Sequence, residues 1–381
     1  MNRRFHASAR SGNRFALLGD GREFFPRMLA AIDASTQYVL AEFYLVESGQ
    51  VADAFIAAFA RATARGVRVR AMFDGFGARG LREIDRARLR SAHVDLVFFN
   101  AARWMILPRT LLRNHRKLLL VDGAIGFTGG TGLADMFSPE AQPETYWLDW
   151  VVEISGPVLG DWHALFARTW KRSAHRDLDV IAQQSPAQHS GELGCVAASA
   201  GLGANDLERS LMRRVRKANA RAWVATAYFW PSMRLRRALR RAARRGVDVR
   251  LLVPGPHTDA PAARSAARLF YARLLSGGVV IYEYQPRFLH AKLALCDDWA
   301  SIGSSNLDRW GVLWNLDANQ EITSPAFAQK VEDAFAQAFG RSVVLRRPSD
   351  VQHHWSVPFW RLLARAILAW SARAVARLRR K

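Results

Sequence analysis

Two short stretches of the chain carry the same three polar side chains at the same spacing. Residues 114–122 read NHRKLLLVD, and residues 289–297 read LHAKLALCD. With 10 histidines, 6 lysines and 21 aspartates in the chain, chance gives on the order of 0.01 occurrences of His-x-Lys-x4-Asp. Two occurrences, 175 residues apart (290 − 115), indicate a shared chemical role.

The histidine and lysine of each stretch suit phosphoryl transfer. His115 and Lys117 are two residues apart, as are His290 and Lys292, so on a strand each pair projects from one face. If two lobes meet about a pseudo-twofold axis, both pairs converge on one cleft. One histidine then attacks phosphorus and the other protonates the leaving alcohol, while the lysines offset the charge on the phosphoryl oxygens.

The choice of lysine supports this interpretation. The chain has 49 arginines and only 6 lysines, yet both motifs contain lysine. These positions therefore favour a compact ammonium point charge over a planar guanidinium.

Four aspartates are candidates for roles around the histidines. A carboxylate that accepts from the second ring nitrogen keeps a nucleophilic histidine oriented, and the matched candidates are Asp149 in WLD and Asp317 in NLD. The motif aspartates Asp122 and Asp297 complete the candidate catalytic trios. We expect these two to brace turns or the lobe interface, and contact with substrate is the alternative.

A turn of small residues follows each motif: TGGTG at 128–132 and IGSSN at 302–306. Such turns can present backbone N–H groups to a phosphate. The supporting candidates here are Gly130 and the side chains of Ser304 and Asn306.

The segments around the motifs also repeat. Residues 38–75 and 223–255 each contain an apolar run, a helical pattern, Arg-Gly-Val-x-Val-Arg and a second apolar run that ends at glycine. Apolar residues at i, i+3, i+4 and i+7 predict a helix in each, and Gly66 and Gly246 predict its end. Each half should therefore hold a βαβ crossover with parallel strands.

The repeat predicts two similar lobes, at residues 1–185 and 186–349, joined by the polar segment 172–194. Residues 350–381 form a third region with a basic amphipathic pattern that includes Trp360 and Trp370. This pattern suits a helix on an anionic bilayer, and a terminal helix docked on the protein is the alternative. Its arginines interrupt every apolar stretch, so it cannot span a bilayer.

The composition of the 381 residues limits the classes of protein. The net charge of +22 implies an anionic partner, either nucleic acid or a membrane surface, although solubility alone also explains a basic chain. Two cysteines imply no disulfide framework. We find no secretory signal, no apolar run of transmembrane length, no Cys/His metal arrangement and no Walker-type loop.

Three stretches carry a resemblance to a known family: residues 114–130, 227–255 and 289–319. The paired motifs and their turns resemble the phospholipase D superfamily. The flanking sequence is similar to the bacterial cardiolipin synthases, especially the shorter B-type members, from about residue 22 to about residue 340.

The resemblance implies an α/β fold of two similar α-β-α sandwich lobes with the active site at their interface. It also implies a phosphatidyltransferase without metal or other cofactor, with phosphatidylglycerol as donor and acceptor. His115 becomes the nucleophile and His290 the acid/base. The expected protein is a monomer, peripheral on the cytoplasmic face of the bacterial cell membrane.

Two departures from the family pattern stand out. Gly132 occupies the position at which the family usually has asparagine, so a phosphate contact is lost or passes to a backbone N–H. The second motif has five residues between Asp297 and Gly303, where the first has six, so its hairpin should be tighter.

Two other functions stay open at this point. The arginine excess also suits a phosphodiesterase that acts on nucleic acid, and water could replace the lipid acceptor. Gly132 motivates the other possibility, an inactive membrane-binding scaffold.

Overall fold

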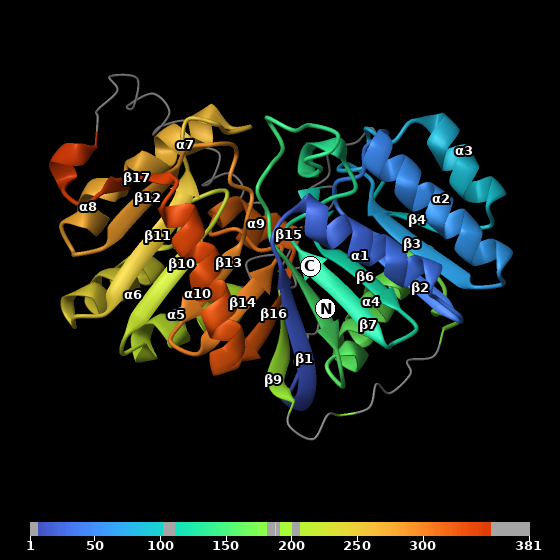
Figure 1. Cartoon of the computed structure of the whole chain (residues 1–381), viewed down its shortest axis with the longest axis horizontal. Helices are drawn as coiled ribbons and strands as arrows, with labels where there is room; N and C mark the ends of the chain where they lie inside the picture. The colour runs from blue at the N-terminus through green and yellow to red at the C-terminus, as the bar shows by residue number, and fades with distance from the viewer. Residues whose placement is uncertain (1–6, 102–110, 181–186, 188–190, 200–205, 352–381) are drawn as a thin grey trace, which may run out of the picture.

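The computed structural model of the chain describes residues 7–101, 111–180, 187, 191–199 and 206–351 (Figure 1). The predicted amphipathic tail lies outside the described residues from 352 onward, so its conformation stays a prediction.

The described part of the chain forms a 15-stranded sheet that runs through the whole molecule. Its order begins with β17 (Ser342–Leu345), β12 (Val280–Tyr284), β11 (Asp248–Pro254), β10 (Arg221–Ala225), β13 (Leu293–Cys296), β14 (Trp299–Gly303), β16 (Ala318–Thr323) and β9 (Glu192–Ala198). It continues with β1 (Arg10–Leu18), β8 (Val151–Ser155), β7 (Ile125–Gly129), β6 (Lys117–Val121), β2 (Tyr38–Phe43), β3 (Arg68–Asp74) and β4 (Asp95–Phe99). Apart from β17, the order of equivalent strands reads the same outward from the central β9–β1 pair.

The repeated segments form the predicted crossovers. In the first half, α2 (Gln50–Ala64) connects β2 to the parallel β3, and in the second, α6 (Met233–Arg244) connects β10 to the parallel β11. Gly66 and Gly246 follow the helices with φ of 85° and 91°, a left-handed conformation that glycine adopts without a Cβ penalty.

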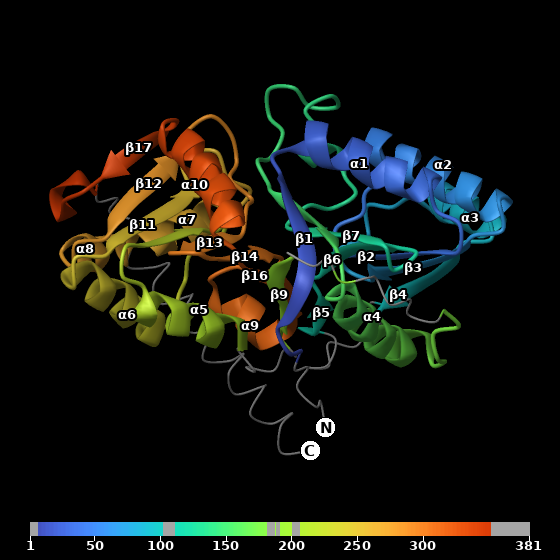
Figure 2. The same cartoon turned by 60° about the horizontal axis from the view of Figure 1, so that its bottom comes forward.

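Helices cover both faces of the sheet (Figure 2). In the first half, α1 (Gly21–Asp33), α2 and α3 (Glu83–Ser91) lie on one face, and α4 (Leu159–Ala174) lies on the other. In the second half, α10 (Pro325–Phe339) lies on the same side as α1, and α5 (Asp206–Lys217) and α6 lie opposite. Three short helices complete the second half: α7 (Pro261–Arg268), α8 (Tyr271–Leu275) and α9 (Arg309–Trp314).

One apolar core cluster extends across both halves. Phe335 of α10 packs against Trp150 of the first half and Trp223 of the second, with ring centroids 5.9 and 5.8 Å away. Trp162 of α4 donates its indole N–H to Gln320 of β16 at 2.8 Å. Buried rings and a buried hydrogen bond of this kind fix the halves relative to each other.

Each motif histidine lies just before its strand, so the prediction that both histidines sit within strands is wrong. At these points the chain pairs with the opposite half: β5 (Arg113–Asn114) with β15 (Asn315–Leu316), and Leu289 with Leu148. The backbone N–H of His115 donates to Leu316 at 3.0 Å, and that of His290 donates to Leu148 at 2.8 Å. These bonds across the halves place both histidines at the centre of the molecule.

The second hairpin is tighter, as the sequence predicts. Two residues separate β13 from β14, and three separate β6 from β7. Asp122 and Asp297 begin these turns with φ of 52° and 50°.

Among the helices of the described residues, none has the length and apolar character that crossing a bilayer requires.

Candidate active site

The motif histidines face one cavity of about 700 Å³ between the two halves. Its walls include His115, Lys117, His290, Gly130 and Asn306. The requirement that both imidazoles share one space is therefore met by the described structure.

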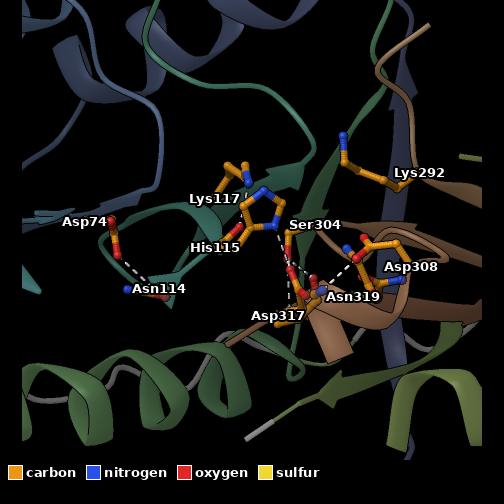
Figure 3. Close-up of polar contacts among 12 residues, drawn as sticks. Asp74, Asn114, His115, Lys117, Lys292, Ser304, Asp308, Asp317 and Asn319 are labelled. Atoms are coloured by element: carbon orange, nitrogen blue, oxygen red, sulfur yellow. Dashed lines mark hydrogen bonds and ion pairs between the residues drawn. The ribbon is translucent and has the colours of Figure 1, made fainter. Parts of the chain in front are cut away.

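His115 is oriented by a carboxylate of the second half. Its Nδ1 lies 2.8 Å from Oδ1 of Asp317, and Ser304 donates its hydroxyl to the same oxygen at 2.7 Å (Figure 3). The Ser304 hydroxyl also accepts the Ala318 N–H at 3.1 Å. The Ser304 hydroxyl therefore holds Asp317. The turn sequence had predicted that this side chain faces the phosphate.

His290, in the second half, is oriented by a carboxylate of the first half. Its Nδ1 lies 2.7 Å from Oδ2 of Asp149. Asp149 also accepts the backbone N–H of Trp150 at 2.8 Å and that of Gly130. Because a Cβ on Gly130 would lie 2.3 Å from Asp149, only glycine fits beside this carboxylate.

The two lysines differ in their contacts. Lys117 donates to the carbonyl of His115 at 2.6 Å and lies 5.2 Å from the ring centroid of Tyr44. Lys292 donates to the carbonyl of His290, and its Nζ lies 2.9 and 3.1 Å from the two ring nitrogens. Lys292 lines a small adjoining cavity of about 40 Å³.

Burial shifts the pKa of both histidines, both lysines and Asp149. It lowers the pKa of His115 to about 4 and that of His290 well below its usual value, and nearby ammonium groups contribute to both shifts. Burial also lowers the pKa of Lys292 to about 8 and that of Lys117 well below its usual value, and it raises that of Asp149 to about 7. Both imidazoles are therefore neutral at pH 7, as a nucleophile requires.

Aromatic rings that no sequence pattern predicted surround the histidines. Tyr44 packs edge-on against His115 with centroids 4.8 Å apart. Around His290 lie Phe137, Trp147 and Phe288, at 5.2, 5.2 and 5.8 Å. These rings exclude water from the imidazoles and contribute to the burial that lowers their pKa values.

A buried polar network behind His115 was also missed. Glu42, inside the apolar strand β2, accepts from Asn114 at 2.6 Å and lies 3.5 Å from Arg116. Asp74 accepts the backbone N–H of Asn114 at 2.8 Å and pairs with Arg113 at 3.3 Å. The sequence signal was Glu42 within the apolar strand β2, and Asp74 directly after the apolar residues 71–73 of β3.

The remaining candidates have distinct positions. Asp122 accepts the backbone N–H groups of residues 36–38, and Asp297 accepts those of residues 219–221. Neither aspartate lines the cavity. A side chain at Gly132 would meet the Leu45 carbonyl oxygen at 2.6 Å, so the family asparagine does not fit there.

The described residues contain no group of three or more His, Cys, Asp or Glu side chains placed to hold a metal ion.

Comparison with known proteins assigns the family. Residues 211–339 match the family model described as cardiolipin synthase, PLD-like domain. The chain is 34% identical over 338 residues to cardiolipin synthase B of Salmonella typhi, which covers 85% of this chain and 80% of that one. The same enzyme of Escherichia coli (strain K12) is 32% identical over 342 residues, covering 86% and 80%.

A solved structure shares the fold. The phosphatidylserine synthase of Haemophilus influenzae Rd KW20 superposes with a TM-score of 0.74 at 15% identity, covering 95% of this chain and 94% of that one. The mixed α/β architecture is therefore that of this phospholipase D-like structure. From the identity shared along most of its length, the chain belongs to the cardiolipin synthase family of phospholipase D-like phosphatidyltransferases.

Proposed function

We propose that the cavity transfers a phosphatidyl group from one phosphatidylglycerol molecule to the headgroup hydroxyl of a second, through a phosphohistidine. One observation carries this proposal. Two neutral histidines, each oriented by a carboxylate of the opposite half, open into the same cavity. With two such groups, one imidazole can attack a phosphorus atom while the other transfers a proton to or from the alcohol oxygen.

In the first step, Nε2 of His115 attacks the phosphorus of the donor lipid. The phosphorus–nitrogen bond forms as the bond to the glycerol oxygen breaks, and His290 delivers a proton to that oxygen. Because the pKa of His290 lies well below its usual value, its protonated form is a strong acid toward the leaving alcohol. His290 is neutral in the empty site and takes up this proton from solvent when the donor binds, because the anionic lipid and Asp149 stabilise the protonated form.

In the second step, His290 removes the proton of the acceptor hydroxyl, which attacks the phosphohistidine. The products are cardiolipin and a free His115, with glycerol released earlier. Lys117 and Lys292 hold the non-bridging oxygens, since each lies within two residues of its histidine and is buried. Asp317 keeps the His115 ring in position for both attacks.

The cavity walls favour a lipid over a nucleic acid. Apolar residues dominate the lining, including Leu45, Phe229, Trp230 and the small alanines of α7. Among the described residues, the lining holds a single arginine, Arg113, which is paired with Asp74. A polyanionic strand calls for a track of free cations, whereas a diacylglycerol group needs apolar walls.

The same geometry supports proposals for the two lobes, the oligomeric state and the location of the protein. We assign residues 1–185 and 186–349 to two similar α-β-α lobes, with the site at their interface. A single chain supplies both histidines and both carboxylates, so a monomer suffices. With a charge of +22, the protein would work as a peripheral enzyme on the anionic cytoplasmic surface of the membrane.

The test is product identification. Purified protein is incubated with phosphatidylglycerol vesicles and, separately, with single-stranded DNA. Cardiolipin with free glycerol is the expected result. DNA fragments would instead support the nuclease, phosphatidic acid would mean that water is the acceptor, and inertness toward both substrates would favour the scaffold.

A second measurement concerns the tail. Deletion of residues 356–381 should weaken sedimentation with anionic vesicles more than it slows turnover of detergent-dispersed lipid. Unchanged sedimentation would mean that the tail packs on the protein.

A further inference from the structure

A second groove, of about 420 Å³, lies between the start of α1 and the end of α10. The two helices run on the same face of the sheet, on either side of β1 (Figures 1 and 2). The groove is separate from the reaction cavity, since the two share no lining residue. Its walls include three arginines from three different segments: Arg22, Arg287 and Arg341.

Arg287 is held in place without an ionic partner. Its guanidinium carbon lies 3.8 Å from the ring centroid of Tyr146, a stacking contact that fixes the plane of the charge. Its Nε is buried and makes no hydrogen bond within the described residues. Burial lowers the pKa of Arg287, the positive charges of Arg341 and Arg22 lower it further, and the charge of Asp20 opposes these shifts in part.

The carboxylates of the groove leave Arg287 and Arg341 without an ion pair among the described residues. Asp20 accepts the backbone N–H of Arg22 at 2.9 Å and pairs with the Arg22 side chain at 3.1 Å. Glu23 accepts the N–H of Gly19 at 2.6 Å. Both acids are therefore committed to the start of α1, and no carboxylate of the described residues lies within ion-pair distance of Arg287 or Arg341.

We propose that this groove binds a phosphate group, through Arg287 and Arg341 with Arg22 at its edge. Guanidinium groups present paired N–H donors that match phosphate oxygens. The buried stem and stacked plane of Arg287 lower the entropy that is lost on binding. The ligand is a phosphate-bearing anion, supplied either by a lipid headgroup or by free phosphate.

The groove adjoins the acid/base side of the reaction cavity. Tyr146 lines the groove, and the next residue, Trp147, lines the cavity. Leu148 and Trp150 line the groove on either side of Asp149, which orients His290. A bound phosphate would therefore contact the same wall that positions the His290–Asp149 pair.

The test is a binding titration that does not require turnover. Three full-length proteins are compared, all with His115→Ala so that no lipid is consumed: the parent, Arg287→Gln/Arg341→Gln, and the control Arg237→Gln/Arg241→Gln. The control removes two exposed charges from α6. The probes are inorganic phosphate and dihexanoylphosphatidylglycerol below its micelle concentration, with dihexanoylphosphatidylcholine as the zwitterionic reference.

We expect the groove variant to bind at least one anionic probe about tenfold more weakly than the control, as loss of charge-assisted hydrogen bonds implies. If only the affinity for the lipid probe falls, the ligand is a lipid headgroup. If the affinity for inorganic phosphate falls, free phosphate is a sufficient ligand. Equal affinities in the groove variant and the control overturn the proposal. If the double variant fails to fold, Arg341→Gln alone, at the exposed rim, gives the same comparison.

Discussion

Behind the first motif the protein buries charges, and behind the second it buries apolar side chains. Glu42 of β2 pairs in register with Leu118, and the equivalent position in β10, opposite Leu293, is Ala225. Between histidine and lysine stands Arg116 in one half and Ala291 in the other. The chemistry of the two motifs is thus repeated, while the structures that hold them have diverged.

The carboxylates differ in a corresponding way. Asp317, which serves His115, is held by the Ser304 hydroxyl, and Asp149, which serves His290, is held by backbone N–H groups. Ser304 and Gly130 occupy equivalent places in the two turns. Two histidines with different supports need not be interchangeable, so the halves should have separable roles.

The largest expected effect separates the two histidines. With a donor that carries p-nitrophenol in place of glycerol, the leaving group needs no proton. His290→Ala should then still release one equivalent of p-nitrophenol per site, while its turnover of phosphatidylglycerol falls by about 10³-fold or more. His115→Ala should release none, because the nucleophile is absent.

Stopped-flow absorbance measures the burst, and His257→Ala, at an exposed position, is the control. A burst in His115→Ala that is missing in His290→Ala would reverse the assigned roles. Full activity toward phosphatidylglycerol in either variant would rule out a shared site.

The next effect concerns the buried charges of the first half. Glu42→Leu leaves Arg116 buried without its carboxylate, so the free energy of unfolding should fall by about 3–5 kcal/mol. Glu42→Leu/Arg116→Met gives this half an apolar support like that of the second and should recover most of the loss. Urea unfolding measures both, and a double variant less stable than the single one would mean that the charges stabilise the fold.

A smaller effect concerns the glycine of the first turn. Gly132→Asn restores the family residue, but its Cβ meets the Leu45 carbonyl oxygen at 2.6 Å, so we expect a loss of about 1–3 kcal/mol in the free energy of unfolding. Gly160→Ala in α4, where a Cβ meets nothing within 4 Å, is the matched control and should be neutral or stabilising. Higher activity without loss of stability in Gly132→Asn would show that the turn can accommodate the side chain.

The sequence predicted what local spacing encodes. The βαβ units, the glycines that end their helices, the tighter second hairpin and the candidate carboxylates Asp149 and Asp317 all follow from short patterns. Local spacing could not pair each carboxylate with its histidine, because those contacts join residues 202 and 141 positions apart.

The same limit explains the other differences. The backbone bonds that draw His115 and His290 out of their strands come from the opposite half. The Ser304 hydroxyl faces Asp317 because that carboxylate is buried beside it, which no pattern within the turn reveals. Interactions between halves depend on the tertiary structure, and one sequence carries little signal for them.

The smallest effect compares the two lysines by pH. The pKa of Lys292 is about 8 in the free site, and that of Lys117 lies well below its usual value. A bound anion raises the pKa of each ammonium, so above pH 8 binding must take up a proton at Lys292. The affinity for a non-reactive phosphonate analogue of phosphatidylglycerol should therefore fall between pH 8 and 9, by at most about tenfold for that one proton.

Calorimetry in two buffers of different ionisation enthalpy counts the protons taken up. Arginines stay charged throughout this range, so the groove between α1 and α10 adds no pH dependence of its own. Lys292→Met should remove one proton from the uptake above pH 8, and any uptake that remains belongs to Lys117. An affinity independent of pH in the parent protein would mean that both ammonium groups are already charged in the empty site, and that the two halves do not differ in this respect.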